Sequence, residues 1–182
     1  EILNTSIRGR KDLEENLTIP FLGEVPLHKG TSDHGIVVRE NSTDPVSESM
    51  RIIRSNMSFM KVQSERMQSV MVTSSNPSAG KTFISSNLAM SLAMTDKRVI
   101  LIDFDLRRRT LSKEFGQRHA RKGLSSYLAG TFTELDDIIF NSNMHANLDI
   151  IYAGPQPPNP AEMLLSEKLD KMIAELKKRY DY

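Results

Sequence analysis

The segment from Val70 to Asp105 constrains the fold most, because four recognisable patterns follow one another in it without a break. Val70–Thr73 is apolar and largely β-branched, and it leads directly into Ser74–Thr82. That second stretch fits the phosphate-loop pattern G-x-x-x-x-G-K-[ST], except that Ser75 occupies the position of the first glycine. The segment therefore predicts a strand, a phosphate-binding loop and a helix in succession.

The residues of this loop match what nucleotide phosphates require. Backbone N–H groups must point at phosphate oxygens, a lysine must reach the terminal phosphates, and a hydroxyl must meet the metal ion. Gly80 permits close approach of the backbone, while Lys81 and Thr82 supply the charge and the hydroxyl. We expect a nucleotide to contact Ser78, Ala79, Gly80, Lys81, Thr82 and Phe83.

A helix and then a buried strand ending in two aspartates are predicted after the loop. Apolar residues recur at helical spacing at Phe83, Ile84, Leu88, Ala89, Leu92 and Ala93. Arg98–Ile102 is then nearly all apolar, as expected of a parallel strand buried on both faces. Asp103 and Asp105 follow it, and Mg²⁺ prefers such hard oxygen ligands. We expect them to bind metal or act in catalysis, although a lone Asp there could also cap a helix.

The remaining elements predict an α/β fold with a parallel sheet flanked by helices. Helices are expected around 11–16, 46–64, 123–130, 134–140 and 161–179, a strand at Leu148–Ala153, and an edge strand or extended stretch at Ile19–Pro26. Strands that alternate with helices favour right-handed crossovers, which place the ligand site at the carboxyl edge of the sheet. We assign 1–43 to an N-terminal lead-in segment and 44–182 to the P-loop domain.

The helix that follows the capping residue Asp44 carries an apolar stripe and a charged flank. The stripe predicts core packing rather than a binding groove, and it consists of Met50, Ile53, Met57 and Met60. Glu48, Arg51 and Arg54 climb one flank at successive i, i+3 steps. By themselves these three predict a solvated face with a weak ion pair of about 0.3–0.5 kcal/mol.

Three consecutive arginines, Arg107 to Arg109, come directly after the acidic pair. On a helix such residues usually face water, but beside a phosphate site they can contribute positive charge, and Arg107 is the best placed. Elsewhere the 24 basic residues are balanced by 23 acidic ones, so nucleic acid is not indicated as an obligate partner. There is no cysteine for a disulfide or thiolate metal site, and no run approaches the roughly 20 apolar residues of a membrane span.

In combination, these motifs resemble the bacterial tyrosine kinases (BY-kinases) of capsule and exopolysaccharide export, in the MinD/ParA-like branch of P-loop proteins. The segments that carry the resemblance are Pro20–Pro26, the E-x-x-R-x-x-R flank, Ser75–Thr82, Ile100–Arg107 and Pro157–Leu164. The resemblance covers almost the whole chain. It implies an ATP- and Mg²⁺-dependent protein tyrosine autokinase that regulates polysaccharide polymerisation and export.

The resemblance also implies roles for individual residues. Asp103 becomes the leading candidate for the base and metal-linked carboxylate, supported by Asp105. Lys81 would stabilise charge on the β- and γ-phosphates and Thr82 would bind Mg²⁺. Glu48, Arg51 and Arg54 would form a contact in a homo-oligomeric ring, in which each subunit presents C-terminal tyrosines to a neighbour.

The same resemblance implies where the protein is located, which partner it has and how far its domain extends. It implies the cytoplasmic face of the bacterial inner membrane and a membrane chain-length regulator, fused or separate. A Walker B strand ending in Asp and a tyrosine-rich tail are expected after Tyr182, so the P-loop domain is expected to lack its C-terminal part. On that expectation residues 1–182 alone are inactive, or the source protein is longer than this sequence.

Two other functions stay open. A MinD/ParA-type ATPase switch carries a signature lysine four positions before Gly80, where this chain has Asn76. A non-catalytic nucleotide-binding scaffold is the other alternative. It is opposed by four intact residues, Lys81, Thr82, Asp103 and Asp105, although the expected truncation leaves it open.

Overall fold

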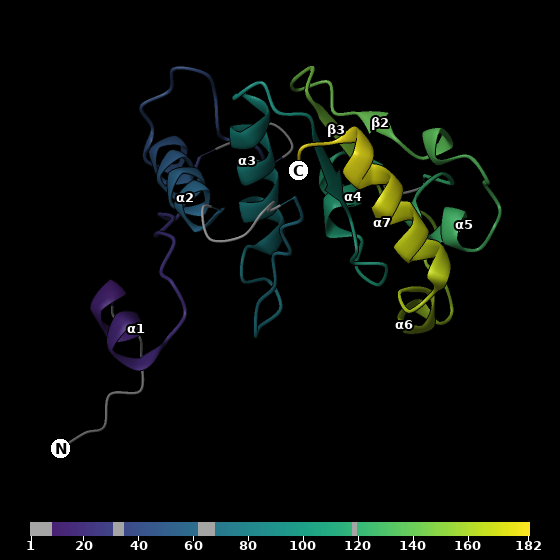
Figure 1. Ribbon diagram of the computed structural model, residues 1–182, viewed down its shortest axis with the longest axis horizontal. Coiled ribbons are helices and arrows are strands. Elements are labelled where there is room, and N and C mark those ends of the chain that lie inside the picture. Colours follow the sequence, from purple (N-terminus) through teal and green to yellow (C-terminus); the bar gives the residue numbers. More distant parts are fainter. Residues whose placement is uncertain (1–8, 31–34, 62–67, 118–119) are drawn as a thin grey trace.

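A mixed three-stranded sheet of order β1-β3-β2 lies at the centre of the molecule (Figure 1). The computed structural model describes residues 9–30, 35–61, 68–117 and 120–182. β1 (Val99–Ile102) pairs in parallel with β3 (Leu148–Ile151), and β2 (Phe140–Asn141) pairs antiparallel with the other edge of β3. The predicted α/β class is confirmed. The sheet is mixed because residues 142–147 are too few for the crossover that a parallel neighbour would need.

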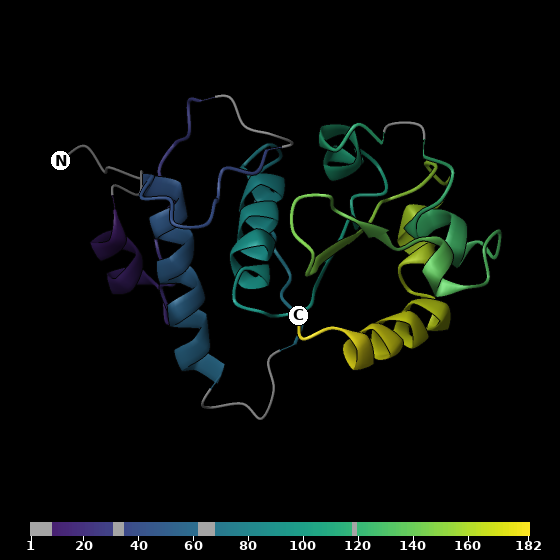
Figure 2. The same cartoon turned by 90° about the horizontal axis from the view of Figure 1, so that it is seen from above.

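Helices cover both faces of this sheet (Figures 1 and 2). The described helices are α1 (Arg10–Asn16), α2 (Pro45–Lys61), α3 (Lys81–Ala93), α4 (Thr110–Glu114), α5 (Leu124–Leu128), α6 (Pro160–Met163) and α7 (Glu167–Arg179), with a 3-10 turn at Leu135–Asp137. Successive side chains of a strand point to opposite faces. Val99 and Leu101 accordingly join the core beneath α2 and α3, whereas Ile100 and Ile102 pack towards α7. No helix within the described ranges is long and apolar enough to cross a membrane.

Most helices lie where the sequence predicts them, but two segments differ. The predicted helix over 134–140 is wrong, because only a 3-10 turn forms and Phe140 pairs with Ile150 in the sheet. The predicted helix over 161–179 is two helices, and α7 begins anew after Ser166, whose hydroxyl accepts the Leu169 N–H at 3.4 Å. Of the α2 helix predicted over 46–64, residues 62–64 lie outside the described residues.

The strand predicted at Val70–Thr73 is also wrong. Among the described residues this segment joins no sheet, and Met71 is 86% exposed. The outer edge of β1 is instead contacted by the last residues of the chain: the Ile100 N–H donates to the Tyr182 carbonyl at 3.0 Å. A strand forms only when a neighbour accepts its backbone hydrogen bonds, and none of the residues that the structure describes does so for Val70–Thr73.

Asn87 fastens the lead-in segment to α3. Its side chain is fully buried; Oδ1 accepts the N–H groups of Val37 and Val38 at 2.8 and 3.1 Å. Its Nδ2 donates to the carbonyls of Gly35 and Phe83 at 2.9 and 2.8 Å. All four hydrogen-bonding positions of the amide are therefore used, and they tie residues 35–38 to the helix that follows the phosphate loop.

The predicted cap of α2 is confirmed. Asp44 Oδ1 accepts the N–H groups of Val46 and Ser47 at 2.9 and 3.1 Å, and Oδ2 accepts the hydroxyls of Ser42 and Ser47. Burial acts to raise the pKa of Asp44, but the hydrogen bonds from Ser42 and Ser47 outweigh it and lower the pKa from 3.8 to about 2. The charged carboxylate is thus the form that the fold prefers.

Asp44→Ala is expected to lower the free energy of unfolding by about 1–2 kcal/mol at pH 7, because α2 loses its cap. The folded-state pKa is depressed, so this contribution is present above the unfolded pKa of 3.8 and is lost as the pH falls towards about 2. Urea unfolding of both proteins between pH 7 and pH 2 measures it. A difference that stayed constant over this range would contradict the assignment.

Candidate active site

The phosphate loop opens α3 in the conformation that its glycine permits. Gly80 directly precedes Lys81 with a φ of 88°, in the left-handed region. A Cβ at Gly80 would meet nothing within 4 Å, so it is the backbone conformation rather than crowding that favours glycine. The Gly80 carbonyl accepts the Ile84 N–H at 2.9 Å as the helix begins. Free N–H groups at the start of this 13-residue helix suit an anion.

Lys81 turns back across the loop. Its Nζ donates to the Ser74 hydroxyl at 3.0 Å, and that hydroxyl donates to the Asn76 carbonyl at 2.7 Å. Among the described residues Lys81 forms no ion pair. Its positive charge is therefore held over the loop by a neutral partner and is available to phosphate oxygens.

Phe83 uses its side chain for packing. Its ring stacks on His28 of the lead-in segment, with centroids 6.2 Å apart and an interplanar angle of 19°. The Nε2 atom of His28 is buried without a hydrogen-bond partner among the described residues. Phe83 can thus contribute its backbone N–H to a nucleotide, while its side chain anchors the start of α3.

Asp103 is buried at the carboxyl end of β1, with only 5% of its surface exposed. Its Oδ2 accepts the N–H and the hydroxyl of Ser112 at 3.1 and 2.8 Å, and its Oδ1 accepts the Asp105 N–H at 3.1 Å. Burial raises the pKa of Asp103 and the negative charge of Asp105 adds to this, although the hydrogen bonds oppose both. The carboxylate is fixed in orientation and is a stronger base than an exposed one.

Ser112 is the site residue that the sequence analysis missed. Its hydroxyl donates to Asp103 and accepts the Ala153 N–H at 3.1 Å, so it joins the ends of β1 and β3. The signal in the sequence was a serine between the apolar Leu111 and Phe115, on the buried side of a short helix. A hydroxyl on a buried face requires a partner, and the preceding acidic pair offered one.

The arginines that follow the acidic pair precede helix α4 instead of lying on it. The Asp105 carboxylate accepts the Arg108 N–H at 2.9 Å and stabilises a turn, so α4 begins only at Thr110. Arg107 and Arg108 are exposed, whereas Arg109 donates to the Gly154 carbonyl at 3.3 Å. Arg109, rather than Arg107, is the arginine directed into the protein.

The two halves of the site share one edge of the sheet. α3 leads along the sheet to the start of β1, and β1 then runs in the opposite direction. The loop before α3 and the segment after β1 therefore lie at the same end of the sheet (Figure 1). Within the described ranges no hydrogen bond or ion pair joins Lys81 or Thr82 to Asp103, and no group of three or more His, Cys, Asp or Glu residues could hold a metal ion. Mg²⁺ commonly uses one or two carboxylates with phosphate oxygens and water, so a sparse protein donor set fits it.

The charged flank of α2 is only partly exposed: Glu48 faces solvent and pairs with Arg51 as expected, but both arginines also contact neighbouring segments. Arg51 pairs with Glu48 and also donates from Nη2 to the Ser42 carbonyl at 2.5 Å. Arg54 donates from Nη1 to the Ser91 carbonyl and hydroxyl at 2.5 and 3.0 Å. The flank therefore connects α2 to α3 within one chain.

Sequence comparison places the chain among P-loop proteins. Residues 67–182 match the sequence model of a family described as an AAA domain. The tyrosine-protein kinase Wzc of Salmonella typhimurium is 38% identical over 141 residues, which cover 78% of this chain and 19% of that kinase. The chain thus spans about a fifth of the length of this curated relative.

Solved structures agree with the sequence comparison. The kinase domain of the Escherichia coli tyrosine kinase ETK superposes with a TM-score of 0.84 at 29% identity, covering 97% of this chain and 71% of that domain. The chimerical protein CapA2B2 gives a TM-score of 0.83 at 32% identity, covering 94% and 72%. The chain therefore belongs to the AAA-domain family of P-loop proteins, in the branch that holds the bacterial tyrosine kinases.

Proposed function

We propose that the chain is the nucleotide-binding core of an ATP-dependent protein tyrosine autokinase that regulates capsule or exopolysaccharide polymerisation and export. The observation that carries the proposal is the pairing of a lysine-bearing phosphate loop with a buried, hydrogen-bonded Asp103 at the same edge of the sheet. Relatives named tyrosine-protein kinases support the choice of tyrosine as the acceptor.

In this proposal Asp103 takes the proton from the attacking tyrosine hydroxyl. A carboxylate has about four acceptor positions, and three of those of Asp103 are used by Ser112 and Asp105. The remaining position lies on Oδ1, and no described residue occupies it, so it is open to the tyrosine proton. The fixed orientation and raised pKa of Asp103 both favour this role.

The loop residues bind and neutralise the phosphates. The N–H groups from Ser78 to Phe83 suit phosphate oxygens, and Lys81 stabilises the negative charge that develops on them. Thr82 and Asp105 are the residues that would hold Mg²⁺ directly, with Asp103 beside them, and the ion supplies further charge neutralisation when it is bound. Arg107, exposed in the turn after β1, is proposed as an additional phosphate contact.

Assembly and location are proposed from the family. The Glu48, Arg51 and Arg54 flank is proposed to contribute to a homo-oligomeric ring at the cytoplasmic face of the bacterial inner membrane, beside or fused to a chain-length regulator. The P-loop domain is proposed to begin at residue 44. The lead-in segment packs against it through Asn87 and through a hydrogen bond from Asn56 to the Leu22 carbonyl at 2.8 Å.

Lys81→Met is expected to abolish tyrosine phosphorylation of the intact protein. The substitution removes the only positive charge that the loop directs at the phosphates and leaves an apolar side chain of similar length. Phosphotyrosine is measured after incubation with ATP and Mg²⁺. Arg98→Gln, which removes a charge from an exposed arginine outside the site, is the control and should retain full phosphorylation.

Two results would contradict the kinase proposal. Label that persists in Lys81→Met would place the reaction elsewhere. ATP hydrolysis without any phosphotyrosine in the unaltered protein would favour an ATPase switch.

A further inference from the structure

Arg109 lies between the ends of β1 and β3, close to the candidate base. Its backbone N–H donates to the Asp105 carbonyl at 2.7 Å, and its Nη1 donates to the Gly154 carbonyl at 3.3 Å. The residue before Gly154 is Ala153, whose N–H donates to the same Ser112 hydroxyl that contacts Asp103. The guanidinium group is therefore close to the hydrogen-bond network of Asp103, at the same edge of the sheet.

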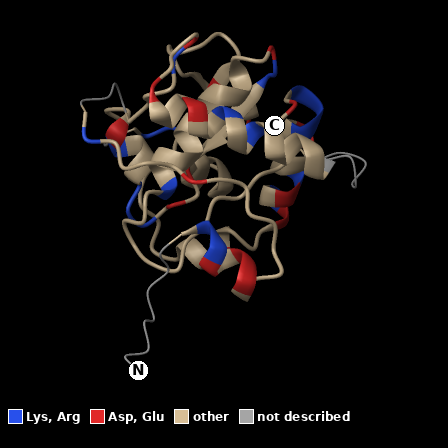
Figure 3. Cartoon of the chain, turned by 90° about the vertical axis from the view of Figure 1, so that its left-hand side faces the viewer, with Lys and Arg blue, Asp and Glu red and all other residues tan. Residues whose placement is uncertain are grey.

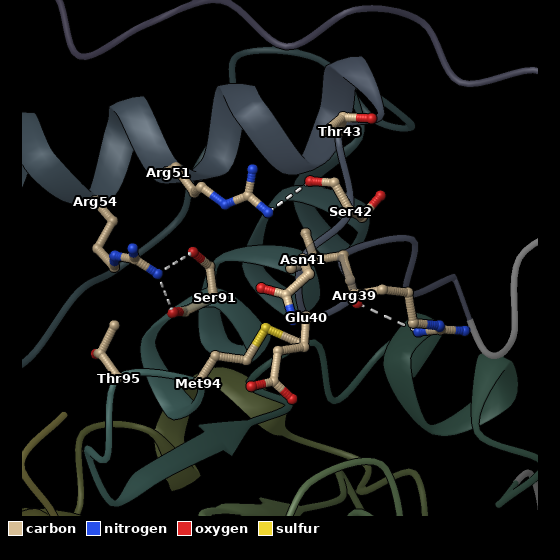
Figure 4. Close-up of a pocket in the computed structure, with 11 residues that line it drawn as sticks. Arg39, Glu40, Asn41, Ser42, Thr43, Arg51, Arg54, Ser91, Met94 and Thr95 are labelled. Carbon is tan, nitrogen blue, oxygen red and sulfur yellow. Dashed lines mark hydrogen bonds between the residues drawn. The ribbon is translucent and has the colours of Figure 1, made fainter.

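The guanidinium group of Arg109 is poorly used within the chain. It carries five N–H donors, and among the described residues only one of them has an acceptor. Its Nε atom is buried without a hydrogen-bond partner, and the described residues give Arg109 no ion pair, although two aspartates precede it closely. Arg54, by contrast, contacts both oxygens of Ser91 (Figure 4). A buried donor without an acceptor is unfavourable, so Arg109 is suited to an acceptor from outside the chain.

The backbone of Arg109 is also unusual. Its φ of 52° and ψ of 47° lie in the left-handed region, which is unfavourable for a long side chain. The carbonyl that it contacts is fixed, because a Cβ at Gly154 would lie only 2.7 Å from the Ser125 Oγ. Arg109 is thus held to a rigid neighbour by one hydrogen bond to a neutral oxygen. A charged acceptor forms a stronger bond and can replace it.

Arg109 lies on the side from which an acceptor would approach. In phosphoryl transfer the attacking and leaving oxygens are roughly in line, so the acceptor comes from the side opposite the nucleotide. Figures 1 and 2 show α3 on one side of β1 and β3, and α5 on the other. The first N–H groups of α5 contact the Tyr152 and Ala153 carbonyls, directly before Gly154. Arg109 therefore lies away from the phosphate loop, towards α5.

We propose that Arg109 determines acceptor specificity by binding an anionic side chain next to the acceptor tyrosine. This inference rests on the proposed kinase function. A guanidinium group can form two parallel hydrogen bonds with a carboxylate or a phosphate, so aspartate, glutamate and phosphotyrosine all fit. The preference must be local, because the net charge is only +1 and residues of both signs occur on the side of the molecule shown in Figure 3.

Phosphorylation of short peptides by the intact protein tests the proposal. Each peptide has one acceptor tyrosine, followed by Glu, phosphotyrosine, Gln or Lys. The Glu or phosphotyrosine peptide is expected to have a kcat/KM about tenfold above that of the Gln peptide, since a charge-assisted pair is gained. Arg109→Gly removes the charge and suits the left-handed backbone, so it should fold and lower this ratio to about one.

Two further variants separate a direct contact from a general effect of charge. Arg109→Glu should reverse the preference, so that the Lys peptide becomes the better substrate. Arg108→Gln removes the charge of the neighbouring, exposed arginine and should keep the tenfold ratio. Nuclear magnetic resonance of the ¹⁵N-labelled intact protein gives a measurement independent of activity, in which the Glu peptide, but not the Gln peptide, shifts the Nε–H signal of Arg109.

The two proposals fail in different ways. Tyrosine phosphorylation with equal kcat/KM for acidic and neutral peptides would overturn the role of Arg109 and leave the kinase function intact. A ratio that stays near tenfold in Arg109→Gly, or that Arg108→Gln lowers as much, would do the same. An unaltered protein that forms no phosphotyrosine on itself or on any peptide would overturn both. Preference for only one of the two acidic peptides supports the contact and identifies the anion.

Discussion

Asp103→Asn is expected to lower the rate of tyrosine phosphorylation by the intact protein about 10²- to 10⁴-fold, the range that a general base typically contributes. The amide of Asn cannot take the proton from a tyrosine hydroxyl. Its Nδ2 also cannot accept the hydrogen bonds that Ser112 or Asp105 donates, so one side of the carboxylate network is lost. Initial rates of phosphotyrosine formation at saturating ATP measure the effect.

Ser112→Ala is the matched variant for this experiment. It removes the hydroxyl that donates to Asp103 Oδ2, while the Ser112 N–H still donates to the same oxygen. We expect a loss of roughly tenfold, well below that of Asp103→Asn, because the carboxylate stays but is held less firmly. A rate for Asp103→Asn within a few-fold of the unaltered protein would exclude Asp103 as the base.

The elements of the candidate site could be predicted from the sequence because their signals are local. The phosphate loop, α3 and β1 each correspond to one continuous pattern, and the structure forms α3 and β1 where those patterns lie. The buried stripe of α2 was predicted equally well, since Met50, Ile53 and Met57 are buried as helical spacing requires. Only Met60, near the end of α2, is more than a third exposed.

The wrong predictions concern segments whose structure depends on a distant neighbour. Val70–Thr73 has the composition of a strand, but composition does not provide the adjacent backbone that a strand needs. Phe140 ends a segment, residues 134–140, that the sequence predicts to be a helix, yet it pairs with Ile150 of β3. Arg51 and Arg54 also donate to carbonyls outside α2, at Ser42 and Ser91, so spacing on α2 could not reveal these contacts.

Asn87→Ala is expected to lower the free energy of unfolding by about 3–5 kcal/mol, since each buried donor left without an acceptor costs roughly 1–3 kcal/mol. The N–H groups of Val37 and Val38 would lose their acceptor, and the carbonyls of Gly35 and Phe83 would lose a donor. At a typical slope of about 2 kcal/mol per molar urea, the unfolding midpoint should fall by about 2 M.

Asn56→Ala is the control for Asn87→Ala, because Asn56 also joins the lead-in segment to a helix, but through a single bond to the Leu22 carbonyl. We expect a loss of about 1 kcal/mol for it. Hydrogen exchange gives a second, local measurement: the amides of Val37 and Val38 should lose protection in Asn87→Ala and keep it in Asn56→Ala. Equal midpoints for the two variants would show that Asn87 contributes no more than one ordinary hydrogen bond. In that case the lead-in segment would be held to α3 mainly by the apolar packing of Ile36 and Val38.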